Sequence, residues 1–245
     1  MLAALGLVWA SAAARADAKL LVPMDLAQEN HLKAYGFAYW CLTQGTNVEW
    51  LLNYRGGAFL MEDAEFLRRK AILLRVTTES VSSGDEASIR STIEEENMEA
   101  VLLEKPPRVA IYTPPDKQPW DDAVTLALTY AEIPYDTIWD EDVLAGRLSD
   151  YDWLHLHHED FTGQYGKFFA AFGATEWYRR QVAENEAMAR RYGYAKVSEL
   201  KKAVVAALKM YVAEGGFLFA MCSATDTIDI ALAATGIDIV AAEYD

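Results

Sequence analysis

The sequence is poor in positive charge and in cysteine. Its 245 residues hold 22 Lys and Arg against 37 Asp and Glu, for a formal net charge of −15. Binding to nucleic acids or to anionic membranes depends on clustered basic side chains, so this balance argues against both kinds of partner. The two cysteines, Cys41 and Cys222, exclude a disulfide-rich scaffold. Because they form no C-x-x-C pair, nothing supports thioredoxin-like redox chemistry or a structural zinc site.

Long apolar runs are scarce too, and the one at the N-terminus indicates export. Residues 2–14 (LAALGLVWASAAA) are apolar, but the run is short for crossing a bilayer. It ends in small residues, and Ala14-Arg15-Ala16 fits a cleavage site before Asp17. We therefore expect residues 1–16 to be a signal peptide. The processed chain would be periplasmic or extracellular, with no stable membrane span. A buried first helix is the alternative.

What is present is globular: 52% of the residues are hydrophobic and 24% are charged. Strand-like runs alternate with helix-like stretches, and a strand–helix–strand succession starts near Leu20 and again near Val109. This alternation predicts a parallel sheet with right-handed crossovers. We expect residues 17–245 to form one α/β domain, a three-layer α/β/α sandwich with a mostly parallel, flavodoxin-like sheet and a helical insertion near 161–195. The chain stops just past a strand-like run, which suggests that this domain is incomplete at its C-terminus.

The segment from Gly215 carries the strongest functional signal. A glycine pair precedes an apolar run at 217–221, which we expect to be a buried strand, and Cys222 follows before a helix-like stretch. This is the layout of a nucleophile elbow, a sharp strand-to-helix turn that exposes a reactive side chain. The helix N-terminus behind it presents unpaired N–H groups, which stabilise a thiolate and an oxyanion. The alternative is a buried structural cysteine.

These residues resemble a known family. The segment GGFLFAMCSATD is similar to the nucleophile region of class I glutamine amidotransferase-like domains, whose fold is flavodoxin-like. Most of residues 19–235 resembles exported bacterial proteins labelled asparagine synthetase B. The segments that carry this resemblance are LLVPMDLAQENHLKAYG, NVEWLLNYRGG, VAIYTPPDKQPWDDAVTLALTYAEIPYDTIWD, YDWLHLHHEDFTGQYGKF and GGFLFAMCSATD. By this resemblance Cys222 occupies the nucleophile position.

The sequence departs from the family pattern in three ways. The amidotransferase motif is G-x-C-x-G, and Ala220 and Ala224 replace both glycines, so we expect a less sharp turn. The family's triad takes a His and a Glu from beyond the cysteine, and no His follows Cys222. Asparagine synthesis implies an S-G-G-x-D-S nucleotide loop and a cysteine at the mature N-terminus. The sequence has neither, which counts against the synthetase label.

A histidine cluster supplies the other candidate catalytic groups. Three of the four histidines lie in LHLHHED, at 155, 157 and 158. On a strand, His155 and His157 share one face, where with a carboxylate they could ligate a divalent metal ion. His157 or His158, with Glu159, could instead serve Cys222 in acid–base steps. The remaining alternative is a hydrogen-bonded cluster that fixes a loop.

Polar residues that follow strand-like runs are candidates for substrate binding. In open α/β sheets ligands bind at the carboxyl ends of the strands, so we expect these loops to form a single pocket with Cys222. The stretch TPPDKQPWDD is also typical of a helix N-terminus with acids in its first turn. The candidate substrate-binding residues are Asp25, Arg55, Asp116, Trp120, Asp121 and Ser223.

The main functional expectation is an exported, amidotransferase-like amide hydrolase with a cysteine nucleophile. Its substrate would be a small molecule, and the chemistry requires no cofactor, although His155 and His157 leave a divalent metal open. The alternatives are a non-catalytic domain that binds a sugar or a peptide, and the synthetase of the family label. The sequence gives no indication of the oligomeric state.

Overall fold

The computed structural model describes residues 18–115, 123–163 and 171–239. These described residues form two compact units, one within the bounds 1–106 and 126–133 and the other within the bounds 107–125 and 134–245. The sequence interpretation treats residues 17–245 as one domain, whereas the contacts group them into two. The expected signal peptide, residues 1–16, lies outside the described residues.

The first unit is built on an antiparallel sheet with the strand order β4-β1-β3-β2-β5. Its strands are β1 (Lys19–Val22), β2 (Val48–Leu52), β3 (Ala58–Glu62), β4 (Glu79–Val81) and β5 (Glu99–Leu103). The parallel sheet expected from the succession near Leu20 is therefore wrong for this half. Strand β3 lies between β1 and β2 and is antiparallel to both, so β1 and β2 run in the same direction without pairing. This is the split βαβ arrangement of ferredoxin-like sheets.

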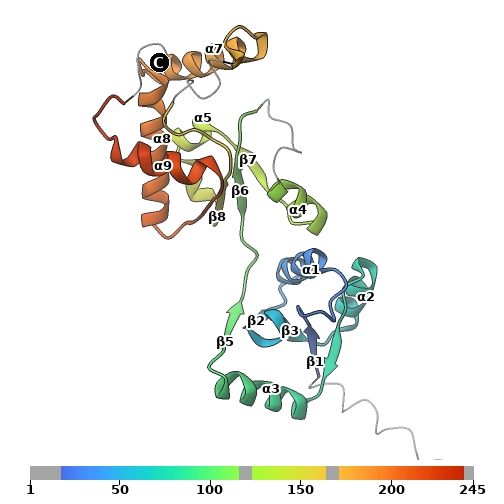
Figure 1. The fold of residues 1–245 in the computed structure, drawn as a ribbon. Helices are drawn as coiled ribbons and strands as arrows, with labels where there is room; N and C mark the ends of the chain where they lie inside the picture. The colour runs from blue at the N-terminus through green and yellow to red at the C-terminus, as the bar shows by residue number, and fades with distance from the viewer. Residues whose placement is uncertain (1–17, 116–122, 164–170, 240–245) are drawn as a thin grey trace, which may run out of the picture. The chain divides into compact units, whose positions relative to one another are not determined.

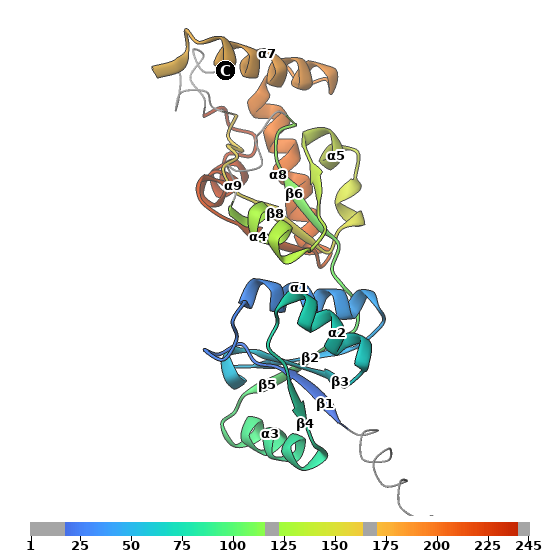
Figure 2. The same cartoon turned by 90° about the vertical axis from the view of Figure 1, so that its right-hand side faces the viewer.

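Helices cover both faces of this sheet, as Figure 2 shows. Helices α1 (His31–Thr43) and α2 (Glu65–Leu74) lie on one face, and α3 (Ser83–Glu95) lies on the other. Side chains alternate along β1, so Leu20 packs with Phe37 of α1 on one face while Leu21 packs with Ile89 of α3 on the other. A capping box between Ser82 and Asp85 fixes the start of α3.

The second unit carries the parallel sheet that the sequence predicts, with the order β7-β6-β8-β9. Strands β7, β6 and β8 are labelled in Figure 1. Its strands are β6 (Val109–Tyr112), β7 (Asp136–Ile138), β8 (Trp153–Leu156) and β9 (Phe217–Ala220). Its helices are α5 (Asp140–Leu144), α7 (Glu176–Arg191), α8 (Val197–Ala213) and α9 (Ser223–Ala233). Helix α4 (Ala123–Ala131) is divided between the units, because its residues from 126 onward belong to the first unit. The core packs Leu154 of β8 against Val204 and Leu208 of α8, and the α/β class is confirmed.

Strand β9 differs from its prediction as a buried strand. It is the last strand of the sheet in the described residues, and it pairs only with β8. Phe217 is 60% exposed and Phe219 41% exposed as a result. The predicted helical insertion contains α7. Within the part of the chain that the structure describes, no helix is both long and apolar enough to cross a membrane.

Candidate functional site

Cys222 is the second residue of the two-residue connection between β9 and α9. The N–H of Met221 still donates to the carbonyl oxygen of Leu156 at 3.0 Å, which extends the pairing of β9 with β8, and Ser223 begins α9. Cys222 itself has φ 51° and ψ −135°, and its side chain is exposed. Positive φ is rare outside glycine and costs about 1–3 kcal/mol where it occurs. The backbone is therefore that of a nucleophile elbow.

The elbow forms with alanine on both sides of the motif, so the less sharp turn expected from Ala220 and Ala224 is wrong. The strain falls on Cys222 alone, while Ala220 ends β9 and Ala224 lies inside α9. Ala224 is completely buried in the core. A small residue is required there because the first turn of α9 packs directly on the neighbouring loop.

That loop, residues 157–163, follows β8 and is called here the histidine loop. Three consecutive carbonyl oxygens of the loop accept hydrogen bonds from the start of α9. The pairs are His157 O with Ala224 N at 3.1 Å, His158 O with the Ser223 hydroxyl at 3.0 Å, and Glu159 O with the Thr227 hydroxyl at 3.0 Å. The backbone that carries both loop histidines is thus fixed beside the helix that begins after Cys222.

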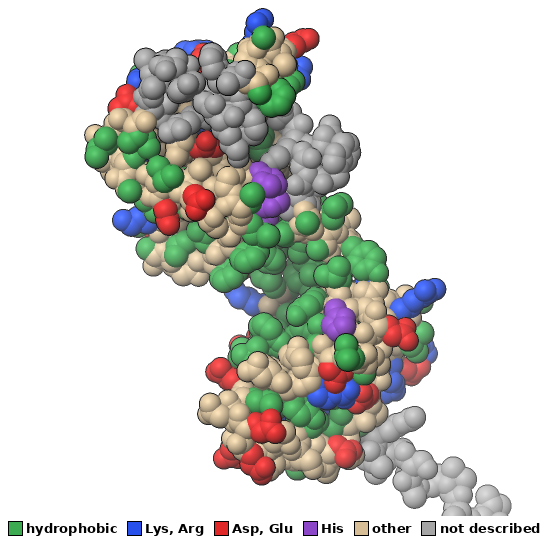
Figure 3. All heavy atoms as spheres, viewed as in Figure 1, with side chains coloured by type: hydrophobic (Ala, Val, Ile, Leu, Met, Phe, Trp, Pro, Cys, Tyr) green, Lys and Arg blue, Asp and Glu red, His purple; other side chains and the backbone are tan. Residues whose placement is uncertain are grey.

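The imidazole rings differ in their surroundings. The rings of His157 and His158 lie 3.6 Å apart between centroids, and His158 is exposed while His157 is half-buried. Histidine side chains reach the surface of the second unit in Figure 3. His155 is completely buried, and its Nδ1 donates to the carbonyl oxygen of Phe219 at 3.2 Å. Of these three histidines, His157 and His158 are therefore the two that solvent reaches.

Glu159 is buried and holds the histidine loop. Its Oε2 accepts the backbone N–H of His157 at 2.8 Å, so the carboxylate closes a tight turn at the end of β8. At the far end of the loop, Gly163 has φ 72° and lies against the backbone of Ser198. Both contacts orient the loop.

Two further sequence predictions concern a metal site and the substrate-binding residues. In residues 18–115, 123–163 and 171–239, no three His, Cys, Asp or Glu side chains gather as ligands for a metal ion. The pair of His155 and His157, with ring centroids 5.9 Å apart, therefore lacks a third ligand among these residues. Of the substrate-binding candidates, Asp116, Trp120 and Asp121 lie outside the described residues.

The sequence predicts that the substrate-binding candidates and Cys222 lie at one edge of a single sheet, but those that the structure describes are divided between two sheets. Ser223 lies beside Cys222 in the second unit, whereas Asp25 and Arg55 belong to the antiparallel sheet of the first unit. There Arg55 forms ion pairs with Asp25 and with Glu79, each at 2.7 Å. The hydrogen bond from Arg55 holds the pKa of Asp25 below its usual range. Asp25 and Arg55 are thus paired with each other within the first unit.

Sequence reasoning missed a buried ionic cluster at the carboxyl end of the parallel sheet. The Nζ of Lys201 lies 2.8 Å from Oδ2 of Asp140 and 3.0 Å from the hydroxyl of Tyr112, which itself donates to Asp140. Lys201 is 4% exposed and Asp140 is fully buried. Burial and the charge of Asp140 raise the pKa of Tyr112 well above its usual value. The sequence does contain a signal that Lys201 is buried, because it falls on the same apolar stripe of α8 as Val197 and Val204.

This ionic cluster packs against the histidine loop. The ring of Tyr112 packs on that of Phe161, with centroids 5.2 Å apart, and Phe161 is a fully buried member of the loop. The Nζ of Lys201 also lies 4.1 Å from the centre of the Trp139 ring. The loop is therefore held between this cluster and α9.

Comparison of the chain with protein-family models, with curated proteins and with solved structures finds no match. Function is therefore inferred from the residues and geometry around Cys222.

Proposed function

We propose that the chain is an exported cysteine hydrolase of small amides, similar to class I glutamine amidotransferases, with Cys222 as its nucleophile. The observation that carries the proposal is the backbone of Cys222, an exposed cysteine held at φ 51° and ψ −135° between β9 and α9. Backbone strain of this kind concentrates at functional sites, where the surrounding structure maintains it. The apolar run at residues 2–14 supports export.

The proposed fold of the second unit is flavodoxin-like. Its order β7-β6-β8-β9 follows chain order 2-1-3-4, as in the first four positions of the flavodoxin-like order 2-1-3-4-5. In such sheets ligands bind outside the carboxyl ends of the strands. Cys222 follows β9 and the histidine loop follows β8, so both candidate groups lie at that edge.

In the proposed reaction, the thiolate of Cys222 attacks the amide carbonyl carbon. A C–S bond forms, and the carbonyl π electrons move to oxygen. The N–H of Ser223, at the first position of α9, is placed to bind this oxyanion, because the N–H of Ala224 is already engaged by His157. Collapse breaks the C–N bond, and the amine leaves with a proton. Water then hydrolyses the thioester and restores the thiol.

The proton transfers are assigned to the neighbouring imidazoles of His157 and His158. One imidazole takes the thiol proton and gives it to the leaving amine, as a general base and then a general acid. The pair precedes the cysteine in the chain, but its loop is hydrogen-bonded to α9. In this proposal, hydrogen bonds between the histidine loop and α9 bring the histidines to Cys222. They take the role of the family's triad histidine, which follows the cysteine in the chain.

The test measures ammonia release from L-glutamine and L-asparagine by the processed chain. We expect turnover that Cys222→Ala abolishes and that His157→Asn or His158→Asn lowers by about 10²–10⁴-fold. Cys41→Ala is the matched control, because Cys41 is fully buried in the other unit and its replacement leaves turnover unchanged. Equal turnover by wild type and Cys222→Ala would refute the assignment.

A non-catalytic binding domain is the second candidate, and the exposed rings of Phe217 and Phe219 favour it. Both aromatic side chains lie on β9, and Phe219 stacks with His155 at 5.8 Å between centroids. Sugars and peptides bind on such exposed rings. This candidate predicts ligand binding without turnover, and binding that Cys222→Ala leaves intact.

A further inference from the structure

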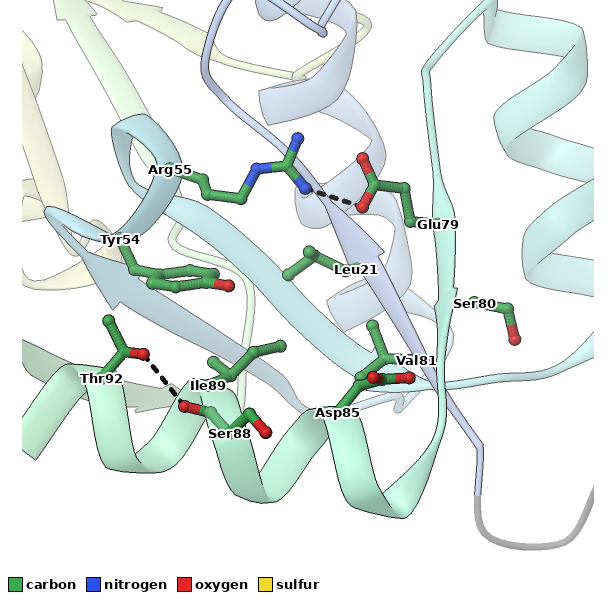
Figure 4. A pocket seen from close by; sticks show the side chains of 10 residues that line it. All are labelled: Leu21, Tyr54, Arg55, Glu79, Ser80, Val81, Asp85, Ser88, Ile89 and Thr92. Carbon is green, nitrogen blue, oxygen red and sulfur yellow. Dashed lines mark hydrogen bonds and ion pairs between the residues drawn. The ribbon is translucent and has the colours of Figure 1, made fainter.

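The first unit holds a cavity of about 320 Å³ between its sheet and α3 (Figure 4). Its floor consists of three buried apolar side chains, those of Leu21, Val81 and Ile89. Tyr54 lies along one side, and the ion pair of Arg55 and Glu79 faces α3 across the cavity. The volume is at the small end of the range for ligand pockets, which fits a small organic molecule.

The turn that carries Tyr54 and Arg55 is strained and fixed in place. Asn53 has φ 66° and Arg55 has φ 47°, values that cost about 1–3 kcal/mol each in residues other than glycine. The carbonyl oxygen of Arg55 accepts the N–H of Met24 at 3.0 Å. A Cβ on Gly56 would lie 2.5 Å from the carbonyl oxygen of Met24, so the turn lies tightly against the end of β1. The rim of the cavity is thus formed before any ligand arrives.

The polar groups of the cavity are mainly hydrogen-bond acceptors. The Ser88 hydroxyl donates to the Gly84 carbonyl at 3.1 Å, and the Thr92 hydroxyl donates to the Ser88 carbonyl at 3.0 Å. Each hydroxyl has one hydrogen, so its lone pairs are what it offers to the cavity. Arg55 directs Nε and Nη2 to Asp25 and Nη1 to Glu79. A ligand that donates hydrogen bonds therefore fits these acceptors.

The local charge selects a cation. The carboxylates of Glu79 and Asp85 line the cavity together with the guanidinium of Arg55, which is also paired with Asp25 beside the cavity, so negative charge is in excess there. The Tyr54 ring offers a face that attracts a cation, and the apolar floor accepts hydrocarbon. We propose that this cavity binds a small organic cation, a primary amine on a short carbon or sugar skeleton. The proposal does not depend on the chemistry assigned to Cys222.

Isothermal titration calorimetry tests the charge requirement with matched pairs of probes. The pairs are putrescine with 1,4-butanediol, and glucosamine with glucose. We expect at least one amine to bind at least about tenfold more tightly than its neutral partner, and raised salt to weaken that binding because the carboxylates are partly exposed. Binding by no amine, or equal binding within both pairs, would overturn the proposal.

Variants then locate the site. Glu79→Gln removes a carboxylate from the cavity, and Ser88→Phe fills the cavity from an exposed position of α3, so each should weaken the amine by about tenfold or more. Glu94→Gln removes the same charge from α3 outside the cavity lining and should change nothing. Equal losses from Glu79→Gln and Glu94→Gln would assign the effect to overall charge and refute the site. Cys222→Ala should bind the amine normally, so failure of one proposal is distinguishable from failure of the other.

Discussion

The backbone N–H of Ala224 donates a hydrogen bond to the carbonyl oxygen of His157 at 3.1 Å. This bond joins the first turn of α9, which begins directly after Cys222, to the loop that carries His157 and His158. Two side-chain bonds from Ser223 and Thr227 repeat the connection on the next two carbonyl oxygens. A cysteine and two histidines separated by more than sixty positions are thereby brought into one structural unit.

The strained backbone at Cys222 predicts that a glycine variant at this position is more stable than an alanine variant. Glycine adopts positive φ without a steric penalty and alanine does not. Cys222→Gly should therefore be about 1 kcal/mol more stable than Cys222→Ala, measured by urea unfolding. Position 91 on α3 is the control, because inside a helix Ser91→Gly should be less stable than Ser91→Ala by about 1 kcal/mol. The same order at both positions would contradict the elbow.

Gly163 predicts a steric requirement at the end of the histidine loop. A Cβ there would lie 2.6 Å from the Cα of Ser198, and φ is 72°. Gly163→Ala should cost about 2 kcal/mol or more in unfolding free energy and also slow the reaction of Cys222. Gly193→Ala is matched, because Gly193 has φ 81° with open space around it. It should cost about 1 kcal/mol and leave Cys222 unaffected. Equal costs would show that the loop does not pack on α8 as described.

The buried ion pair predicts that a single replacement is worse than a double one. Lys201→Met leaves the charge of Asp140 buried without its counter-ion and should cost about 3–5 kcal/mol in denaturant unfolding. Adding Asp140→Asn removes that charge and should recover part of the loss. The exposed pair of Arg190 and Glu186 is the control, and Arg190→Gln should change stability by less than about 1 kcal/mol. A double variant as unstable as Lys201→Met would count against this account.

Much of the secondary structure is predictable from local pattern, whereas strand pairing is not. Apolar runs locate β1, β2 and the four strands of the parallel sheet. Nothing local shows that Ala58–Glu62 inserts between β1 and β2, which changes a parallel sheet into an antiparallel one. Strand β4 has three residues and produces no apolar run, whereas residues 100–103 of β5 are apolar but are not among the predicted strands. The edge position of β9 likewise follows from sheet order alone.

Some parts of the candidate site are likewise predictable from local pattern, and others are not. The elbow is predictable because a strand, a cysteine, small residues and a helix are consecutive in the chain. The pair of Lys201 and Asp140 is not, since its members are 61 positions apart and each is unremarkable in its own segment. The assignment of Asp25 and Arg55 to a different unit from Cys222 depends on the division into two units, which the composition does not mark.

Burial of Cys41 predicts a loss of stability at alkaline pH. Burial raises the pKa of its thiol to about 12, above the value of about 8.5 in an unfolded chain. Only the unfolded state then releases the proton between these values, so unfolding becomes easier as pH rises from about 8.5 to 12. The free energy of unfolding should fall by up to about 1.4 kcal/mol per pH unit relative to Cys41→Val. Tyrosine ionisation acts on both proteins and cancels in the difference. A difference independent of pH would contradict the burial.

The central claim is that Cys222 is an activated nucleophile served by the histidine loop. The most direct measurement is intact-protein mass spectrometry of the chain mixed with p-nitrophenyl acetate. We predict one acetyl group per chain, held as a thioester that hydroxylamine removes. It should form equally in Cys41→Ala, more slowly in His157→Asn or His158→Asn, and not in Cys222→Ala. A chain that acquires no thioester, or acquires it in Cys222→Ala, would contradict the account.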